Sequence, residues 1–139
     1  MEKQQTIYNQ VLGLIVPTEI LDCFELSEVI ESNQAIELQL HERKELIPAA
    51  LQGEDVVLDG FCNPIELQSF PLKGKATFIK LFRRRWKRRG SRKHVSNTYD
   101  FADSGTKATR LFGAFLKGAF GLSPDTFQHA RARVMHPRK

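Results

Sequence analysis

Residues 73–93 read KGKATFIKLFRRRWKRRGSRK. A glycine-containing turn precedes a segment of β-branched, aromatic and aliphatic residues, which predicts a strand over residues 76–86. Phe78, Phe82 and Trp86 recur every four residues, so a helix with an apolar stripe is the alternative. We expect the strand to be covered on both faces at first, and then to continue into solvent as a basic arm made by its arginines.

The segments before this stretch are typical of hairpins. Ile36, Leu38 and Leu40 alternate with polar residues, which is the period of a strand with one buried face. An apolar segment ends at Pro17, which can open a short helix through residue 23 or 24. Strands are predicted over residues 24–31, 36–41, 56–61 and 65–70, with turns at residues 32–34 and 62–64 and a loop at residues 46–53.

The segments after the basic stretch predict a short return strand and then helices. The return strand is expected over residues 94–101. One amphipathic helix is predicted from the apolar residues Leu111, Phe112, Phe115, Leu116, Ala119 and Phe120, capped by Ser104 or Thr106. A second helix opens at residues 123–125 and runs through Val134. The pair is either a helix-turn-helix or an αα-hairpin that only packs.

These elements predict an α+β fold. We expect a small twisted antiparallel sheet of hairpins with a short N-terminal helix, followed by one or two C-terminal helices. Residues 1–103 form the α+β module with its basic β-arm, and residues 104–139 form a helical C-terminal segment, the last 20 or so residues of which are either a helix or a tail.

Charge divides the chain in two. Residues 1–69 hold three basic and thirteen acidic side chains, whereas residues 70–139 hold eighteen basic and three acidic ones. Eleven of the basic side chains lie in residues 73–93, which contain no acidic residue. The cations of such a patch repel one another. The best explanation for the patch is that it binds a polyanion and neutralises its phosphates. A merely solvated face or a tail is the alternative.

The expected binding residues are the basic side chains of that stretch and the tryptophan among them. Guanidinium groups bind phosphate oxygens bidentately, and such contacts position a protein on DNA without reading its sequence. Trp86 either stacks on a base or closes the core as a rim residue. The predicted DNA-binding residues are Lys73, Lys75, Lys80, Arg83, Arg84, Arg85, Trp86, Lys87, Arg88, Arg89, Arg92 and Lys93.

No enzyme signature is found in the sequence. Cys23 and Cys62 are the only cysteines, without a CxxC pair, so we predict neither a metal site nor a cofactor. Asp100 and Asp103 have the spacing of metal ligands, but a turn acid and a cap acid explain them better. No apolar run approaches the roughly 20 residues of a membrane span, and no signal peptide is recognisable. A cytoplasmic, non-catalytic protein is expected.

The order of several segments resembles a known family. FPLKGK at residues 70–75, RRRW at 83–86, GTKAT at 105–109 and FGAFLK at 112–117 follow one another as in the N-terminal region of bacterial insertion-sequence transposases of the Aon type. The likeness covers roughly residues 15–117. Related transposases carry a zinc-binding β module with CxxC pairs there, and this chain lacks those cysteines.

The resemblance implies a metal-free β module that holds the double-stranded DNA of element ends. A separately encoded catalytic domain, with three carboxylates around divalent metal, would then carry out strand transfer. The acidic half would face away from the DNA or dock on that catalytic partner. Two other classes stay open, namely an RNA-binding protein and a non-catalytic protein-interaction subunit.

Overall fold

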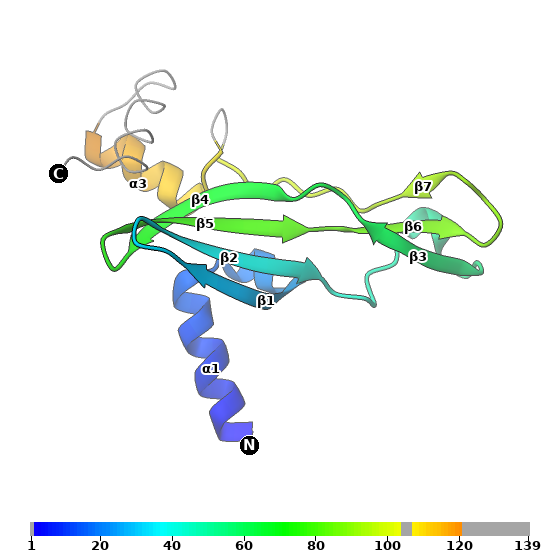
Figure 1. Cartoon of the computed structure of the whole chain (residues 1–139), viewed down its shortest axis with the longest axis horizontal. Helices are drawn as coiled ribbons and strands as arrows, with labels where there is room; N and C mark the ends of the chain where they lie inside the picture. The colour runs from blue at the N-terminus through cyan, green and yellow to red at the C-terminus, as the bar shows by residue number, and fades with distance from the viewer. Residues whose placement is uncertain (1, 104–106, 121–139) are drawn as a thin grey trace.

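Two β-sheets lie end to end along the long axis of the molecule (Figure 1). The computed structural model describes residues 2–103 and 107–120. The elements are α1 (Glu2–Ile15), α2 (Thr18–Leu21), β1 (Phe24–Glu31), β2 (Ala35–Glu42), the 3-10 helix η1 (Ala49–Leu51), β3 (Val56–Phe61), β4 (Ile65–Leu72), β5 (Lys75–Phe82), β6 (Arg84–Arg88), β7 (His94–Val95) and α3 (Arg110–Phe120). The predicted α+β class, with antiparallel hairpins between an N-terminal and a C-terminal helix, is confirmed.

The larger sheet, sheet A, has the strand order β1-β2-β5-β4. β1 and β2 form one antiparallel hairpin, and β4 and β5 form the other. The turn between β4 and β5 has positive φ at both Lys73 (56°) and Gly74 (73°), as a two-residue hairpin requires. β2 and β5 join the hairpins by pairing in parallel, a contact that the sequence analysis did not predict.

The smaller sheet, sheet B, has the order β3-β6-β7 and is antiparallel. The chain passes from sheet A to β3, returns for β4 and β5, and enters sheet B again through β6. The expected strand over residues 76–86 is therefore two strands that meet at Arg83. The expectation of a solvent-exposed arm is wrong, because β6 is the middle strand of sheet B. The return strand is also shorter than expected, with two residues in β7.

The main core lies on one face of sheet A, under α2 and the end of α1. Alternation builds it, since every second residue of β2 is buried. In register with β2, Leu38 lies beside Ile79 and Leu40 beside Leu81. The core cluster is Val16, Ile20, Phe24, Ile36, Leu38, Leu40, Leu67, Ile79, Leu81 and Phe101.

The helix α3 packs beside β4. Its Phe112 and Phe115 rings lie 5.1 and 5.4 Å from the ring of Phe70. A parallel bridge between Gln68 and Ala108 continues the edge of β4 into the segment before the helix. The first predicted C-terminal helix is confirmed. The second predicted helix and the caps at residues 104 and 106 lie outside the described residues.

Candidate nucleic-acid interface

The three lysines predicted to bind DNA from sheet A have carboxylate partners. The Nζ atoms of Lys75 and Lys73 lie 2.7 and 2.9 Å from Oε2 of Glu31, at the end of β1. Their hydrogen bonds lower the pKa of Glu31 to about 2. Lys80 Nζ lies 3.1 Å from Oε1 of Glu37, on the neighbouring strand. The acidic half of the chain therefore compensates Lys80 and, through the one carboxylate of Glu31, part of the charge of Lys73 and Lys75.

Arg88 and Arg89, at the end of β6, are also paired. Arg88 donates from Nε and Nη2 to the two carboxylate oxygens of Glu54, at 2.6 and 2.9 Å. This fork lowers the pKa of Glu54 and raises that of Arg88. Arg89 Nε lies 2.8 Å from Oδ2 of Asp55. The four side chains of these pairs are 41% to 70% exposed. Exposed ion pairs exchange readily with a competing anion.

Arg83 and Arg84 form the joint between the two sheets. Arg83 donates from Nη1 to the carbonyl oxygen of Asn97 at 3.0 Å, and its own carbonyl accepts the N–H of Cys62. Arg84 Nε donates to the carbonyl oxygen of Glu42 at 2.7 Å, and its guanidinium lies over the ring of Phe61. Both guanidinium groups bond to carbonyl oxygens rather than to carboxylates. The two residues therefore stabilise the joint, and their charge adds positive potential near it.

Glu42 is the buried centre of this joint, with 1% of its surface exposed. Its Oε1 accepts the backbone N–H of Arg84 at 2.8 Å. Its Oε2 accepts from Asn97 Nδ2 at 2.9 Å and from the hydroxyl of Tyr99. Burial, together with the bond to this carboxylate, raises the pKa of Tyr99. Glu42 was not predicted as a site residue, although the alternation of Ile36, Leu38 and Leu40 continues to it and places it on the buried face.

Trp86 does not present its ring to solvent. It is 8% exposed and lies in register with Leu58 and Val95 on one face of sheet B. Arg88, two residues on, reaches the carbonyl of Ala50 in η1, so η1 lies over this face. Of the two alternatives for Trp86, this burial favours the packing one over base stacking.

The opposite face of sheet B is cationic and partly exposed. Arg85 and Lys87 alternate with Trp86 and so point to this face, where Lys87 pairs in register with His94. Arg85 Nε donates to the carbonyl oxygen of Asp59 at 2.8 Å, and His94 Nε2 contacts the Asp59 carboxylate. The His94 contact lowers the pKa of Asp59, and the charges of Lys87 and Arg85 add to the effect.

The β6–β7 hairpin ends in a turn that carries uncompensated charge. Gly90, with φ of 82°, and Ser91, whose hydroxyl accepts the N–H of Lys93, shape this turn. Arg92 and Lys93 are exposed. Within the described part of the chain, neither of them nor Lys87 makes an ion pair. The hairpin lies at one end of the long axis, on the right in Figure 1.

The two charged halves of the sequence are interleaved in space. Glu54, Asp55 and Asp59, from the acidic half, lie on or beside β3 and face cations of β6 and β7. These three counterions were not predicted from the sequence. Glu54 and Asp55 directly precede the predicted strand at residues 56–61, and Asp59 lies within it. Sheet B still has an excess of positive charge, since residues 83–95 hold eight cations and residues 54–61 hold three carboxylates.

A serine–histidine contact on sheet A has a structural role. Ser27 Oγ lies 2.6 Å from Nδ1 of His41 and within hydrogen-bond distance of the carbonyl oxygen of Gln39. The hydroxyl has one hydrogen, so the tautomer of His41 decides whether Nδ1 donates to Oγ or accepts from it. Ser27 occupies a β-bulge between Leu26 and Glu28, and these bonds hold that bulge.

The acidic pair considered as a metal site is engaged elsewhere. Asp103 contacts Lys117 of α3 at 2.6 Å, and Asp100 lies 3.4 Å from Arg110. In residues 2–103 and 107–120, no group of three His, Cys, Asp or Glu side chains is placed to hold a metal ion. No helix in those ranges is long and apolar enough to cross a membrane. Comparison of the chain with models of protein families, with curated proteins and with solved structures found no match.

Proposed function

We propose that the chain is a cytoplasmic DNA-binding module that holds the phosphate backbone of double-stranded DNA through sheet B and the β6–β7 hairpin. One observation carries this proposal. Lys87, Arg92 and Lys93 lie at the cationic face and tip of sheet B and make no ion pair within the described residues. When cations gathered in this way neutralise phosphates, the counterions of the nucleic acid are released, and this release favours binding.

The shape of the hairpin supports the same role. β6 also pairs with β3, so the part of the hairpin that can enter a groove of DNA is its turn and not a free two-stranded ribbon. The β6–β7 hairpin lies at the end of the long axis, so its tip is accessible (Figure 1). Arg85 and Lys87 on its cationic face and the two cations of its tip could then contact phosphates on both sides of a groove.

The resemblance to Aon-type insertion-sequence transposases gives this activity a context. In that context the module binds element ends, and a separately encoded catalytic domain carries out strand transfer. This proposal assigns the main contacts to fewer residues than the sequence predicted. Lys73, Lys75 and Lys80 have carboxylate partners on sheet A, so we assign the main contacts to Arg85, Lys87, Arg92 and Lys93.

A salt titration tests the proposal. The variant Lys87→Ala/Arg92→Ala/Lys93→Ala removes three cations that make no ion pair in the described chain, so its fold should be preserved. Each lost phosphate contact reduces the slope of log K against log salt by about 0.9 for duplex DNA, so the triple variant should lose up to about 2.7. Fluorescence anisotropy of a labelled duplex at several salt concentrations measures this slope.

The matched control is Lys73→Ala/Lys75→Ala, which removes two cations from sheet A that already neutralise Glu31. Its slope should stay close to that of the unmodified chain. A triple variant with an unchanged slope removes the hairpin from the interface. If the salt slope of the control falls as much per lysine as that of the triple variant, the binding surface is not sheet B.

Competition between nucleic acids separates the alternatives. Single-stranded RNA is held largely by bases stacked on exposed aromatic rings, and Trp86 is buried. We therefore expect duplex DNA to displace a labelled duplex at lower concentration than RNA of equal length. Preferential displacement by RNA would favour an RNA-binding protein. No binding to either polymer would favour an acidic protein partner for the cationic face.

A further inference from the structure

The helix α1 stands away from the body of the protein. It projects from sheet A and is attached at its C-terminal end (Figure 1). None of its fourteen residues is buried. Leu14 is 87% exposed, and Ile7, Tyr8 and Val11 are about half exposed. A helix of this length is marginally stable in water by itself, so an unburied apolar helix indicates a missing contact surface.

The sequence of α1 limits the chemistry of that surface. No residue from Gln4 to Thr18 is charged. Ile7, Val11 and Leu14 follow at the spacing i, i+4, i+7, which places them on one stripe of the helix. A solvated helix normally carries charges opposite such a stripe, whereas this helix is charged only at Glu2 and Lys3, at its far end. The surface that it meets is therefore apolar and is not a polyanion.

An apolar groove of about 440 Å³ runs beside α1, between the helix and sheet A. Val29 of β1 lies opposite Leu38, on the core face of the sheet, yet is 54% exposed. The core face is thus left uncovered at this edge. The groove is lined by Tyr8, Val11, Leu12 and Ile15 of the helix and by sheet residues that include Leu26 and Leu72.

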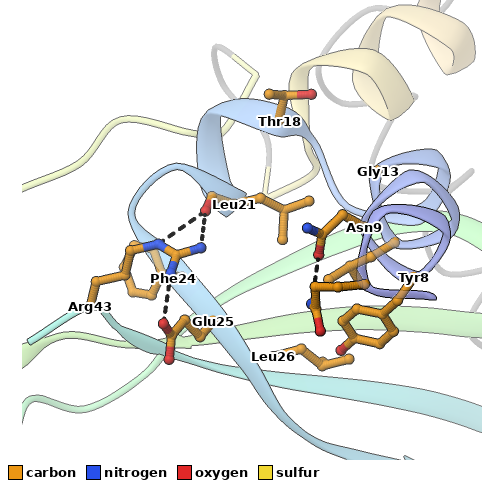
Figure 2. A pocket seen from close by; sticks show the side chains of 11 residues that line it. Tyr8, Asn9, Gly13, Thr18, Leu21, Phe24, Glu25, Leu26 and Arg43 are labelled. Carbon is orange, nitrogen blue, oxygen red and sulfur yellow. Dashed lines mark hydrogen bonds and ion pairs between the residues drawn. The ribbon is translucent and has the colours of Figure 1, made fainter. Parts of the chain in front are cut away.

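A second hollow, of about 550 Å³, adjoins the groove along α1 and has more polar walls. Figure 2 shows Arg43 bonded to Glu25 and to the carbonyl of Leu21 on the side of this hollow that faces Asn9 of the helix. The distance from Arg43 Nη1 to the Glu25 carboxylate is 2.6 Å. The apolar groove is therefore the side of α1 that is available for docking.

We propose that two copies of this chain associate by laying α1 of each copy into the groove of the other. The helix and the groove lie next to each other on one molecule, so a twofold axis buries both at once, as an isologous interface requires. Eleven residues line the groove, four of them from α1, and the exposed Ile7 and Leu14 of the stripe add to the contact, so the interface is a small one.

Electrostatics limits where a second copy can bind. The whole chain carries a net charge of +5, so two copies repel each other over most orientations. The groove and helix form a neutral region, because the charged residues at the groove's edge, Glu31 and Lys73, are paired with each other at 2.9 Å. The cationic hairpins lie in sheet B, away from this contact, so dimerisation leaves both free. The inference thus goes beyond the proposed DNA binding and does not depend on it.

The oligomeric state of the full chain tests the proposal. Sedimentation velocity over a range of concentrations should give a species of twice the chain mass of 15.9 kDa. Val11→Glu and, separately, Leu14→Glu should shift this species to the monomer by placing a charge in the apolar contact. Both positions are at least half exposed in the monomer, so neither change should unfold it. Circular dichroism melting confirms this for each variant.

Thr6→Glu is the matched control. At 100° per residue it lies about 140° round the helix from Val11, away from the groove, and it should remain dimeric. A chain that is monomeric at every concentration overturns the proposal, and the groove then belongs to a different partner or to residues 121–139. A dimer that survives both glutamate substitutions overturns it equally, since its contact must lie elsewhere.

Discussion

At the scale of single residues, Glu42 connects the two sheets. Its carboxylate accepts three hydrogen bonds, from Arg84, Asn97 and Tyr99, in a site with almost no solvent exposure. Glu42→Ala leaves these donors without their acceptor, and buried donors of this kind cost about 1–3 kcal/mol each when unpaired. We expect the free energy of unfolding to fall by about 3 kcal/mol, as measured by urea denaturation.

The control for this substitution is Glu45→Ala, three residues along. Glu45 is exposed and makes no hydrogen bond or ion pair within the described residues, so the change should stay within about 0.5 kcal/mol. Tyr99→Phe in the Glu42→Ala background should cost less than it does alone, because its acceptor is already gone. Equal losses in both backgrounds would mean that the hydroxyl is not bonded to Glu42.

At the scale of elements, local pattern predicted most strands, but it missed α1, the break at Arg83, the short length of β7 and the pairing between the hairpins. The alternation of Ile36, Leu38 and Leu40 predicts a strand with one buried face, and β2 buries those residues. The parallel contact of β2 with β5 joins residues some forty positions apart. No local period encodes that contact, because it depends on how two hairpins pack against α2 and the end of α1.

The same limit applies to the candidate interface. The composition of residues 83–89 predicts a cationic strand correctly, but it cannot reveal which strands pair with the two edges of that strand. β3, from about thirty residues earlier, places Glu54 and Asp55 against Arg88 and Arg89. Which cations remain free is thus a property of strand register, which the sequence alone did not provide.

Asp59 gives a prediction at this scale. It lies among Arg85, Lys87 and His94 on the cationic face of sheet B, where it competes with any phosphate for those cations. Asp59→Asn should tighten binding to duplex DNA and steepen the salt slope by up to about 0.9. Fluorescence anisotropy at several salt concentrations measures both quantities.

Glu31→Gln is the control with the same change in net charge. It frees Lys73 and Lys75 on sheet A and should leave the slope nearly unchanged. A slope that steepens equally in both variants would show that net charge alone, and not the face of sheet B, sets the affinity.

At the scale of the whole molecule, the opposite charges of the two sequence halves hold the sheets together. β2 and β3 come from the acidic half, and their partner strands β5 and β6 come from the basic half. Glu31, Glu54 and Asp59 all have a lowered pKa because a cation of the basic half is bonded to each. Stability of the fold should therefore depend on these carboxylates remaining ionised.

Acid unfolding tests this dependence through Glu31, whose pKa is about 2 in the folded chain and about 4.3 when unfolded. A lowered pKa adds stability above the unfolded value, and this contribution is lost as the pH falls from about 4.3 toward 2. Glu31→Gln should lower the urea midpoint at neutral pH and reduce the loss of midpoint across that range. Glu28→Gln, at an exposed position of β1 without an ion pair in the described chain, should follow the unmodified protein. If Glu31→Gln and the unmodified chain lose stability in parallel, the pairs of Glu31 with Lys73 and Lys75 contribute nothing to holding the halves together.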